Sequence, residues 1–218
     1  MAALLDLLLP PACAACGSAG ALLCEACLGG ARPASDPAAI FVAPDAGIAM
    51  GEDLTLALAA FAFDGPIRRA LARLKYEGTW RLARPLAEAA TPTLRLLLEL
   101  SGSVPLVPVP VHRERLRERG YNQAELIARE LGSIVGLPAL GLLERVRPTT
   151  KQHRLDRAAR LANLREAFSL RSHVRSLPST VILVDDIVTT TATQEACASV
   201  LRAAGIPEIY GLAIAREV

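Results

Sequence analysis

Aromatic side chains are scarce in this 218-residue sequence, at 4% of residues, and lysine is scarcer, with two residues against 22 arginines. The formal net charge is only +2, which excludes a strongly basic, histone-like binder of nucleic acid. Hydrophobic residues make up 52% of the chain, and this excludes global disorder because enough apolar surface can be buried. The length suits one sizeable core with a small appendage. GC-rich coding is a simple explanation of the arginine bias, so the bias alone indicates no function.

Long apolar runs are also absent. The N-terminal run 2–9 contains an aspartate, stops at Pro10-Pro11 and is too short to span a bilayer. It lacks the basic residues that begin a secretory signal peptide. We therefore expect a cytoplasmic protein with no membrane insertion.

Four of the five cysteines are clustered in two Cys-x2-Cys pairs, seven residues apart: Cys13, Cys16, Cys24 and Cys27. Two such pairs can surround one tetrahedral ion, and thiolates suit zinc. Four protein ligands leave no open position, so the predicted zinc is structural. The alternatives are two disulfides, an iron–sulfur cluster or a degenerate site without metal. The fifth cysteine, Cys197, stands in an alanine-rich stretch and is expected to be a small buried hydrophobe.

The sequence pattern divides the chain into three parts. Residues 1–30 form the cysteine module, residues 31–53 predict a linker, and residues 54–218 carry periodic elements. Strands are expected at 55–63, 104–111, 180–184 and 209–215. Helices are expected at 67–76, 80–100, 121–135 and 194–204, with Pro85 and Pro92 limiting the continuity of the second and a mobile excursion at 145–168. Apolar strands alternating with helices predict an α/β fold with a largely parallel sheet.

The most informative stretch is 181–193, VILVDDIVTTTAT. Four apolar residues predict a central strand, and Asp185 and Asp186 follow at its carboxyl end, where open α/β sheets bind ligands. Small hydroxyl residues then open a helix, whose N-terminal N–H groups can bind phosphate. The aspartates would repel a phosphate, so they are expected to face ribose hydroxyls or a hydrated Mg²⁺. The alternative is an ordinary strand–turn–helix with solvated aspartates.

This stretch resembles the 5-phosphoribosyl-1-pyrophosphate (PRPP) motif of type I phosphoribosyltransferases. Residues 107–123 resemble the pyrophosphate loop and following helix, and residues 147–168 resemble the flexible loop that closes over PRPP. Lys75-Tyr-Glu-Gly78 is a short motif after the first helix. With the four cysteines, these segments make essentially the whole chain similar to the competence protein F family (ComF/ComFC and GntX-like proteins), most weakly in 29–53.

The resemblance implies a type I phosphoribosyltransferase-like domain, with a mostly parallel sheet flanked by helices, behind a small zinc-finger module. It implies a role in natural competence, the uptake and processing of transforming DNA, with a competence helicase and single-stranded DNA as partners. It also implies that the catalytic pair Asp185 and Asp186 holds the ribose of PRPP, with Mg²⁺. The 5′-phosphate would be held by the loop that follows: Thr189, Thr190, Thr191, Ala192 and Thr193.

Thr191 departs from the family pattern, because most members have glycine at this position. Glycine permits a positive φ and a close approach to phosphate, whereas β-branched threonine is costly there. One outcome is a loop whose backbone threonine tolerates, with its hydroxyl added as a ligand. The other is reduced PRPP affinity, with the domain binding a different phosphate compound or serving only as a scaffold.

An enzyme of this type would displace pyrophosphate from C1 of PRPP, and cations must face the charge that develops on the leaving group. Arg113, Lys151 and Arg157 are the candidates, since the planar guanidinium binds pyrophosphate with two parallel hydrogen bonds. No general base stands out, although His112 and His153 are possible. The acceptor is not specified by the sequence.

The same basic residues favour a competing hypothesis, nucleic-acid binding without catalysis. Residues 145–175 contain nine Arg and Lys against two acidic residues, and four more arginines lie within 113–119. Such a surface could follow a phosphate backbone, with Tyr76, Tyr121 and Phe168 stacking on bases. A third hypothesis is an adaptor whose zinc module docks a helicase.

Overall fold

The structure is a computed structural model that describes residues 10–34, 52–147 and 166–217. Its helices are α2 (Glu25–Gly29), α4 (Gly65–Tyr76), the short 3₁₀ helix η2 (Trp80–Leu82), α5 (Ala83–Ser101), α6 (Arg113–Arg119), α7 (Gln123–Val135) and α9 (Ala192–Ala203). Its strands are β1 (Leu56–Ala62), β2 (Leu106–Pro108), β3 (Leu143–Arg145), β4 (Phe168–Leu170), β5 (Thr180–Val188) and β6 (Glu208–Arg216). None of the helices described here has both the length and the apolar character needed to cross a membrane.

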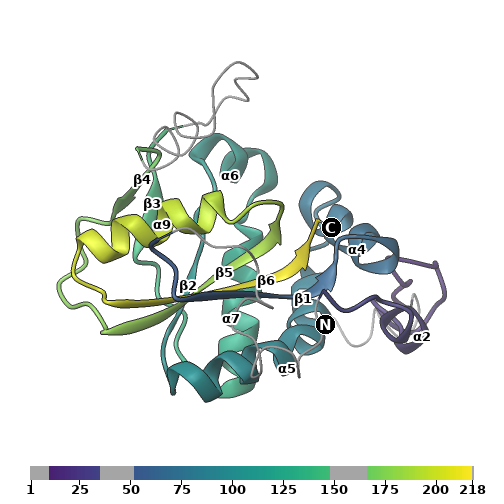
Figure 1. Cartoon of the computed structure of the whole chain (residues 1–218). Coiled ribbons are helices and arrows are strands. Elements are labelled where there is room, and N and C mark those ends of the chain that lie inside the picture. The colour runs from purple at the N-terminus through teal and green to yellow at the C-terminus, as the bar shows by residue number, and fades with distance from the viewer. Residues whose placement is uncertain (1–9, 35–51, 148–165, 218) are drawn as a thin grey trace.

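Four strands form one parallel sheet in the order β1-β6-β5-β2, and β3 pairs with β4 in a separate antiparallel ribbon. The buried side chains fall into two cores, one on each face of the sheet. Helices α4, α5 and α7 cover one face, and α9 with the β3–β4 ribbon covers the other (Figure 1). This parallel sheet flanked by helices, with the four-cysteine module beside it, confirms the predicted fold class.

The central strand β5 is longer than its apolar run predicts. It continues through both aspartates to Val188, because β6 offers partners along its whole length, with Asp185 opposite Ala213 and Val188 opposite Arg216. The aspartates therefore lie within the paired strand and not beyond its end. In contrast, the strand expected at 104–111 is reduced to β2, since prolines cannot donate ladder hydrogen bonds.

Helix α5 runs without a break through Pro92, so the expectation that this proline interrupts the helix is wrong. Proline removes one N–H from the helix interior. Pro92 is on the exposed side, where water can satisfy the released carbonyl, while seven buried residues of α5 hold the helix against the sheet. Packing of that apolar face outweighs the local defect.

The other helix boundaries follow their capping residues. Asn122 accepts a hydrogen bond from the Ala124 N–H at 3.1 Å at the start of α7, and Gly136 ends that helix with φ of 74°. Asp64 is at the N-cap of α4, but its side chain makes no capping hydrogen bond. Its carboxylate instead pairs with Arg32, with an N–O distance of 2.6 Å.

The cysteine module packs on the sheet domain. Cys13 and Leu23 are buried in the same core as α4 and α5, and the chain after the module runs beside β1. There Ala62 N–H donates to the Arg32 carbonyl at 2.8 Å, so the start of the segment 31–53 lies against the sheet edge. Residues 35–51 lie outside the described residues, and the three-part division of the chain stays a prediction.

Candidate functional site

The two adjacent aspartates of β5 face opposite sides of the sheet, as successive residues of a strand must. Asp186 is directed to the face covered by α4, α5 and α7. Asp185 is directed to the face covered by α9 and the β3–β4 ribbon, where its charge raises the pKa of Arg145 and of Cys197. The two carboxylates therefore lie in different layers of the molecule, one on each face of the sheet.

Asp186 is held by a buried ion pair with the last turn of α4. Its Oδ2 lies 2.7 Å from the Lys75 Nζ, and the two side chains are only 5% and 16% exposed. Its Oδ1 accepts a hydrogen bond from the Ile187 N–H at 2.8 Å. Because both oxygens are engaged and water is largely excluded, the position of this carboxylate is fixed. Lys75 is the first residue of the Lys75-Tyr-Glu-Gly78 motif, for which the sequence alone indicated no contact.

Asp185 has a different environment. Its Oδ1 accepts a hydrogen bond from the Asp186 N–H at 2.8 Å. Burial raises the pKa of Asp185 well above its usual range, the adjacent charge of Asp186 raises it further, and Lys75 offsets part of the rise. The pair is therefore asymmetric: Asp186 has a buried counter-ion, whereas the pKa of Asp185 is raised.

The threonine loop that follows β5 leads directly into α9. Thr189 and Thr190 are exposed, and Thr191 is buried at the N-cap of the helix with φ of −67° and ψ of −1°. This is ordinary right-handed backbone, and no described residue other than glycine has a positive φ. Of the two outcomes considered for Thr191, the loop has the backbone that threonine tolerates.

Of the three basic residues predicted to bind pyrophosphate, the structure describes only one. Arg113 begins α6, is exposed and pairs with Glu144 of β3 at 3.6 Å, not with either aspartate. Lys151 and Arg157 lie outside the described residues, as does His153. His112 caps α6, with its Nδ1 accepting from the Glu114 N–H at 3.4 Å.

Arg145 was one of nine basic residues in its stretch and was not singled out from the sequence. It lies in β3 with its guanidinium 5.2 Å from the centre of the Phe168 ring. Burial lowers the pKa of Arg145, as does the nearby charge of Arg115, while Asp185 acts in the opposite direction. Only its place in a strand that packs on the sheet distinguishes it from its neighbours.

Two of the three aromatic rings expected to stack on bases are poorly placed for it. Phe168 is only 4% exposed and lies beneath Arg145, so its selection is wrong. Tyr121 is partly buried and donates its hydroxyl to the Leu74 carbonyl at 2.5 Å. Tyr76, in contrast, is 75% exposed, and Trp80, which the sequence analysis overlooked, is 58% exposed.

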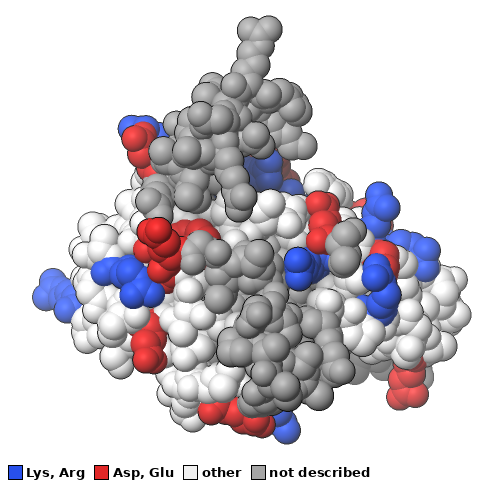
Figure 2. Space-filling view, in the orientation of Figure 1, with Lys and Arg blue, Asp and Glu red and all other residues white. Residues whose placement is uncertain are grey.

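The surface around Tyr76 combines exposed rings with arginines. The Arg119 guanidinium lies 5.2 Å from the centre of the Tyr76 ring, and a cavity of about 410 Å³ opens beside it. Arg115, Lys75 and Tyr121 also line that cavity. Elsewhere the charges are mixed: Figure 2 shows basic and acidic side chains interspersed over the face it presents.

The four clustered cysteines could hold one metal ion. Their sulfur atoms all lie within 4.8 Å of one another, and those of Cys16 and Cys24 are 3.7 Å apart. A tetrahedral zinc site with Zn–S bonds of about 2.3 Å has sulfur–sulfur edges of about 3.8 Å, so the cluster fits this ion. A disulfide requires about 2.05 Å, and all five cysteines are free in this structure. The Cys24 N–H also donates to the Cys13 sulfur at 3.4 Å.

The cysteine environments differ. Burial raises the pKa of Cys13, but backbone N–H donors from Cys24, Cys16 and Ala15 outweigh this and bring it to about 6. Cys197 lies within α9 and is fully buried, and this burial raises its pKa well above the usual range. The prediction that Cys197 is a small buried hydrophobe is confirmed.

Curated relatives of the chain carry names connected with DNA uptake and use. Competence protein F of Haemophilus influenzae is 32% identical over 156 residues, which cover 69% of this chain and 68% of that protein. Competence protein ComFC of Streptococcus pneumoniae is 27% identical over 158 residues, or 72% of this chain and 67% of that protein. DNA utilization protein YhgH of Salmonella typhi is 32% identical over 141 residues, and the chain spans 61% of its length.

Other comparisons are weaker. No family model matches the sequence. Among solved structures, the allosteric regulatory enzyme of purine biosynthesis is 18% identical with a TM-score of 0.38. The match covers 61% of this chain and 26% of that one, and a likeness at this level carries no argument about function.

The cysteine geometry predicts that the purified protein carries about one zinc ion per chain, since four thiolates complete a tetrahedral shell. Replacing Cys16 and Cys24 together by serine should abolish metal retention, measured by elemental analysis after extensive dialysis. Cys197→Ser is the matched control and should keep the metal, because Cys197 lies in the core on the other face of the sheet from the cluster. Full zinc content in the double variant would contradict the site.

The buried ion pair predicts a large stability loss on removal of its cation. Lys75→Met should lower the free energy of unfolding by about 3–5 kcal/mol, because Asp186 remains buried without a counter-ion. Arg73→Met is the control on the same helix. It breaks an exposed pair with Glu77 and should cost less than about 1 kcal/mol. Urea denaturation measures both, and equal losses would show that the buried pair contributes no more than the surface one.

Proposed function

The chain belongs to the competence protein F family, and from this premise we propose that it is a phosphoribosyltransferase-like protein that binds PRPP or a related phosphorylated ribose. Its role would be in DNA uptake and processing. The observation that carries the proposal is the site at the end of β5, where the Lys75–Asp186 ion pair, Asp185 and the threonine loop adjoin the start of α9. A sugar phosphate bound at this end of the sheet would contact the threonine loop and Asp185 from the α9 side, and Asp186, fixed by Lys75, from the opposite face.

The 5′-phosphate fits the loop between β5 and α9. Thr189 and Thr190 are exposed, and with Thr193 they supply hydroxyl donors beside the N–H groups of a 12-residue helix. The positive end of the helix dipole favours a dianion there. Thr191 is the buried N-cap, so its replacement of glycine does not obstruct this arrangement by backbone strain.

The ribose hydroxyls fit the two carboxylates. Asp186 is fixed by Lys75, so it can accept hydrogen bonds in one defined direction. Asp185 is the member of the pair that gains most from a bound ligand, because hydroxyl donors or a cation offset its burial. A Mg²⁺ ion held by PRPP and Asp185 would neutralise part of the pyrophosphate charge.

In the reaction that this arrangement suits, an acceptor nucleophile bonds to C1 of the ribose as the C1–O bond to pyrophosphate breaks. Pyrophosphate leaves with the bonding electron pair, and the acceptor's proton passes to solvent. Arg113, with Lys151 and Arg157, would stabilise the leaving charge. The four cysteines would hold a structural zinc that keeps the N-terminal module folded.

Calorimetric titration with PRPP and Mg²⁺ tests the proposal. Wild-type protein should bind PRPP, and Asp185→Asn should weaken the affinity at least about tenfold, since charge-assisted hydrogen bonds to the ribose are lost. Asp64→Asn is the matched control, because this exposed aspartate pairs only with Arg32 among the described residues. Absence of binding at millimolar PRPP would remove the proposed function.

A second candidate function, binding of single-stranded nucleic acid, is favoured by the exposed Tyr76 beside Arg119 and by the exposed Trp80, four residues further along the chain. Exposed rings flanked by guanidinium groups suit base stacking and backbone contact. This surface adjoins the Lys75 end of the proposed phosphoribosyl site, so the two functions would use neighbouring parts of the same molecule.

Fluorescence anisotropy with a labelled oligothymidine tests this second function. Trp80→Ala should weaken binding by about 1–3 kcal/mol, the usual contribution of one stacked base. Leu100→Ala is the control, since it removes another exposed apolar side chain outside the surface. Equal affinities of the two variants, or affinity that does not fall with added salt, would argue against a nucleic-acid surface here.

A further inference from the structure

A cavity of about 410 Å³ lies beside the Lys75 end of the proposed site, between the end of α4 and helix α6. Among the described residues, neither Arg113 nor any member of the threonine loop lines it. The cavity is therefore separate from the groups assigned to the leaving pyrophosphate and to the 5′-phosphate. It still adjoins the ribose end of the site, because Lys75 lies in its wall and pairs with Asp186 at 2.7 Å.

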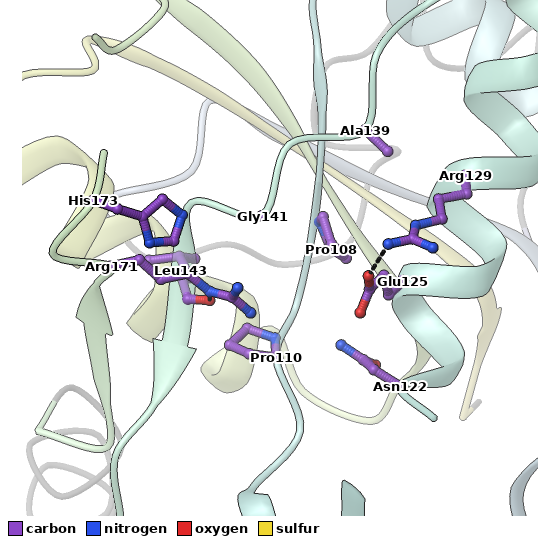
Figure 3. A pocket seen from close by; sticks show the side chains of 10 residues that line it. All are labelled: Pro108, Pro110, Asn122, Glu125, Arg129, Ala139, Gly141, Leu143, Arg171 and His173. Carbon is purple, nitrogen blue, oxygen red and sulfur yellow. Dashed lines mark hydrogen bonds and ion pairs between the residues drawn. The ribbon is translucent and has the colours of Figure 1, made fainter. Parts of the chain in front are cut away.

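A smaller cavity, of about 230 Å³, lies beside β2 (Figure 3) and differs in two respects. Its arginines are engaged within the protein, since Arg129 pairs with Glu125 at 2.6 Å and the Arg171 Nε donates to the Leu143 carbonyl at 3.0 Å. It also adjoins the loop after β2, which the resemblance assigns to pyrophosphate. The larger cavity beside α4 is therefore the better candidate for a further ligand.

The tyrosine rings of the larger cavity are held in fixed positions. The Arg119 guanidinium lies 5.2 Å from the centre of the Tyr76 ring, and its Nη1 donates to the Gln123 Oε1 at 3.1 Å. The Tyr121 hydroxyl donates to the Leu74 carbonyl. Tyr76 is nevertheless 75% exposed, so a flat ring can stack on it. Because the protein already orients this tyrosine, stacking costs little side-chain entropy.

The charged groups in the wall differ in what they contact. Lys75 is committed to Asp186, and Arg119 is committed to the contacts just given. Arg115 and Glu118 are exposed, and neither is ion-paired with another described residue. The Glu118 carboxylate can accept hydrogen bonds from an amino group, and it would repel a pyrophosphate. The cavity thus suits a ring that carries N–H donors, with a single phosphate group near Arg115.

A nucleobase has this combination of groups. Adenine and cytosine carry an exocyclic amino group, whereas thymine presents a carbonyl oxygen and a methyl group. Trp80 is a further exposed ring, at 58%, and follows Gly78 of the cavity wall by two residues. A neighbouring base could stack on Trp80, and the phosphate between two bases could meet Arg115. A free base would use neither residue, so both favour a base within a single strand.

We propose that this cavity is the acceptor subsite, and that the acceptor is an amino-bearing base of a single nucleic-acid strand. The proposal rests on the proposed function, because it needs a phosphoribosyl donor bound beside Asp186. The amino nitrogen of the base bonds to C1 of the ribose as the C1–O bond to pyrophosphate breaks. Pyrophosphate leaves with the bonding electron pair, and the amino proton passes to solvent.

Mass spectrometry of an oligonucleotide incubated with the protein, PRPP and Mg²⁺ tests the proposal. Oligodeoxycytidine should gain the mass of ribose 5-phosphate, and oligothymidine of equal length should not, because thymine lacks the amino group. Glu118→Ala should slow this gain at least about tenfold, as expected for a lost hydrogen bond to a charged group. Glu99→Ala removes an exposed carboxylate of α5 and is the control, which should react as the wild type does.

Calorimetric titration with PRPP separates this proposal from the proposed function. Glu118→Ala should bind PRPP as the wild type does, because Glu118 is outside the groups assigned to the donor. If wild-type protein does not bind PRPP, the proposed function fails and the acceptor subsite fails with it. If PRPP binds but oligodeoxycytidine gains no mass, or if Glu118→Ala reacts as fast as the wild type, only the acceptor subsite is overturned. Transfer to free cytosine but not to the strand would also overturn it.

Discussion

The buried ion pair between Lys75 and Asp186 is the constraint on which the arrangement of the site depends. It joins the last turn of α4 to the central strand, and it can form only because the apolar face of α4 is buried on the same side of the sheet. The hydrogen bond from the Tyr121 hydroxyl to the Leu74 carbonyl adds the start of α7 to the same point. Three segments that are far apart in the sequence thus converge on the last turn of α4. Since an unpaired buried charge is costly, each segment restricts the others.

Strand alternation and parallel register then distribute the remaining groups. Because Asp186 faces the α4 side, Asp185 must face α9 and the β3–β4 ribbon, where Arg145 lies. Because β2 pairs with β5 in register, the loop after β2 begins beside the aspartates. The positions of the threonine loop and of the loop after β2 are therefore consequences of where the parallel strands end, which is the usual position of ligands in open α/β sheets.

Much of this could be predicted from local sequence, and the rest depends on tertiary contacts. The apolar runs located β1, β5 and β6, and the helical periodicity over 121–135 located α7, because burial patterns are local signals. The length of β5 depends on β6, and the continuity of α5 through Pro92 depends on its packed face. The half-burial of Arg145 could not be read from a stretch where every third or fourth residue is basic. Nothing local distinguished the exposed Trp80 from a core tryptophan.

Several arginines of this chain make hydrogen bonds that lysine could not make. Several of the described arginines use Nε together with a terminal nitrogen, as Arg32 does with Asp64 and Arg202 with the Asp53 carbonyl, and Arg171 uses Nε with the Leu143 carbonyl. Lysine has no donor at that position, so it cannot replace arginine in such contacts. Lys75 is the only lysine among the described residues, and it occupies the one place where a compact ammonium meets a single buried carboxylate oxygen. A guanidinium there would bring more N–H donors than the single free oxygen Oδ2 can accept, because Oδ1 already accepts from the Ile187 N–H. Codon usage can account for the number of arginines, but the position of this lysine follows from the chemistry of Asp186.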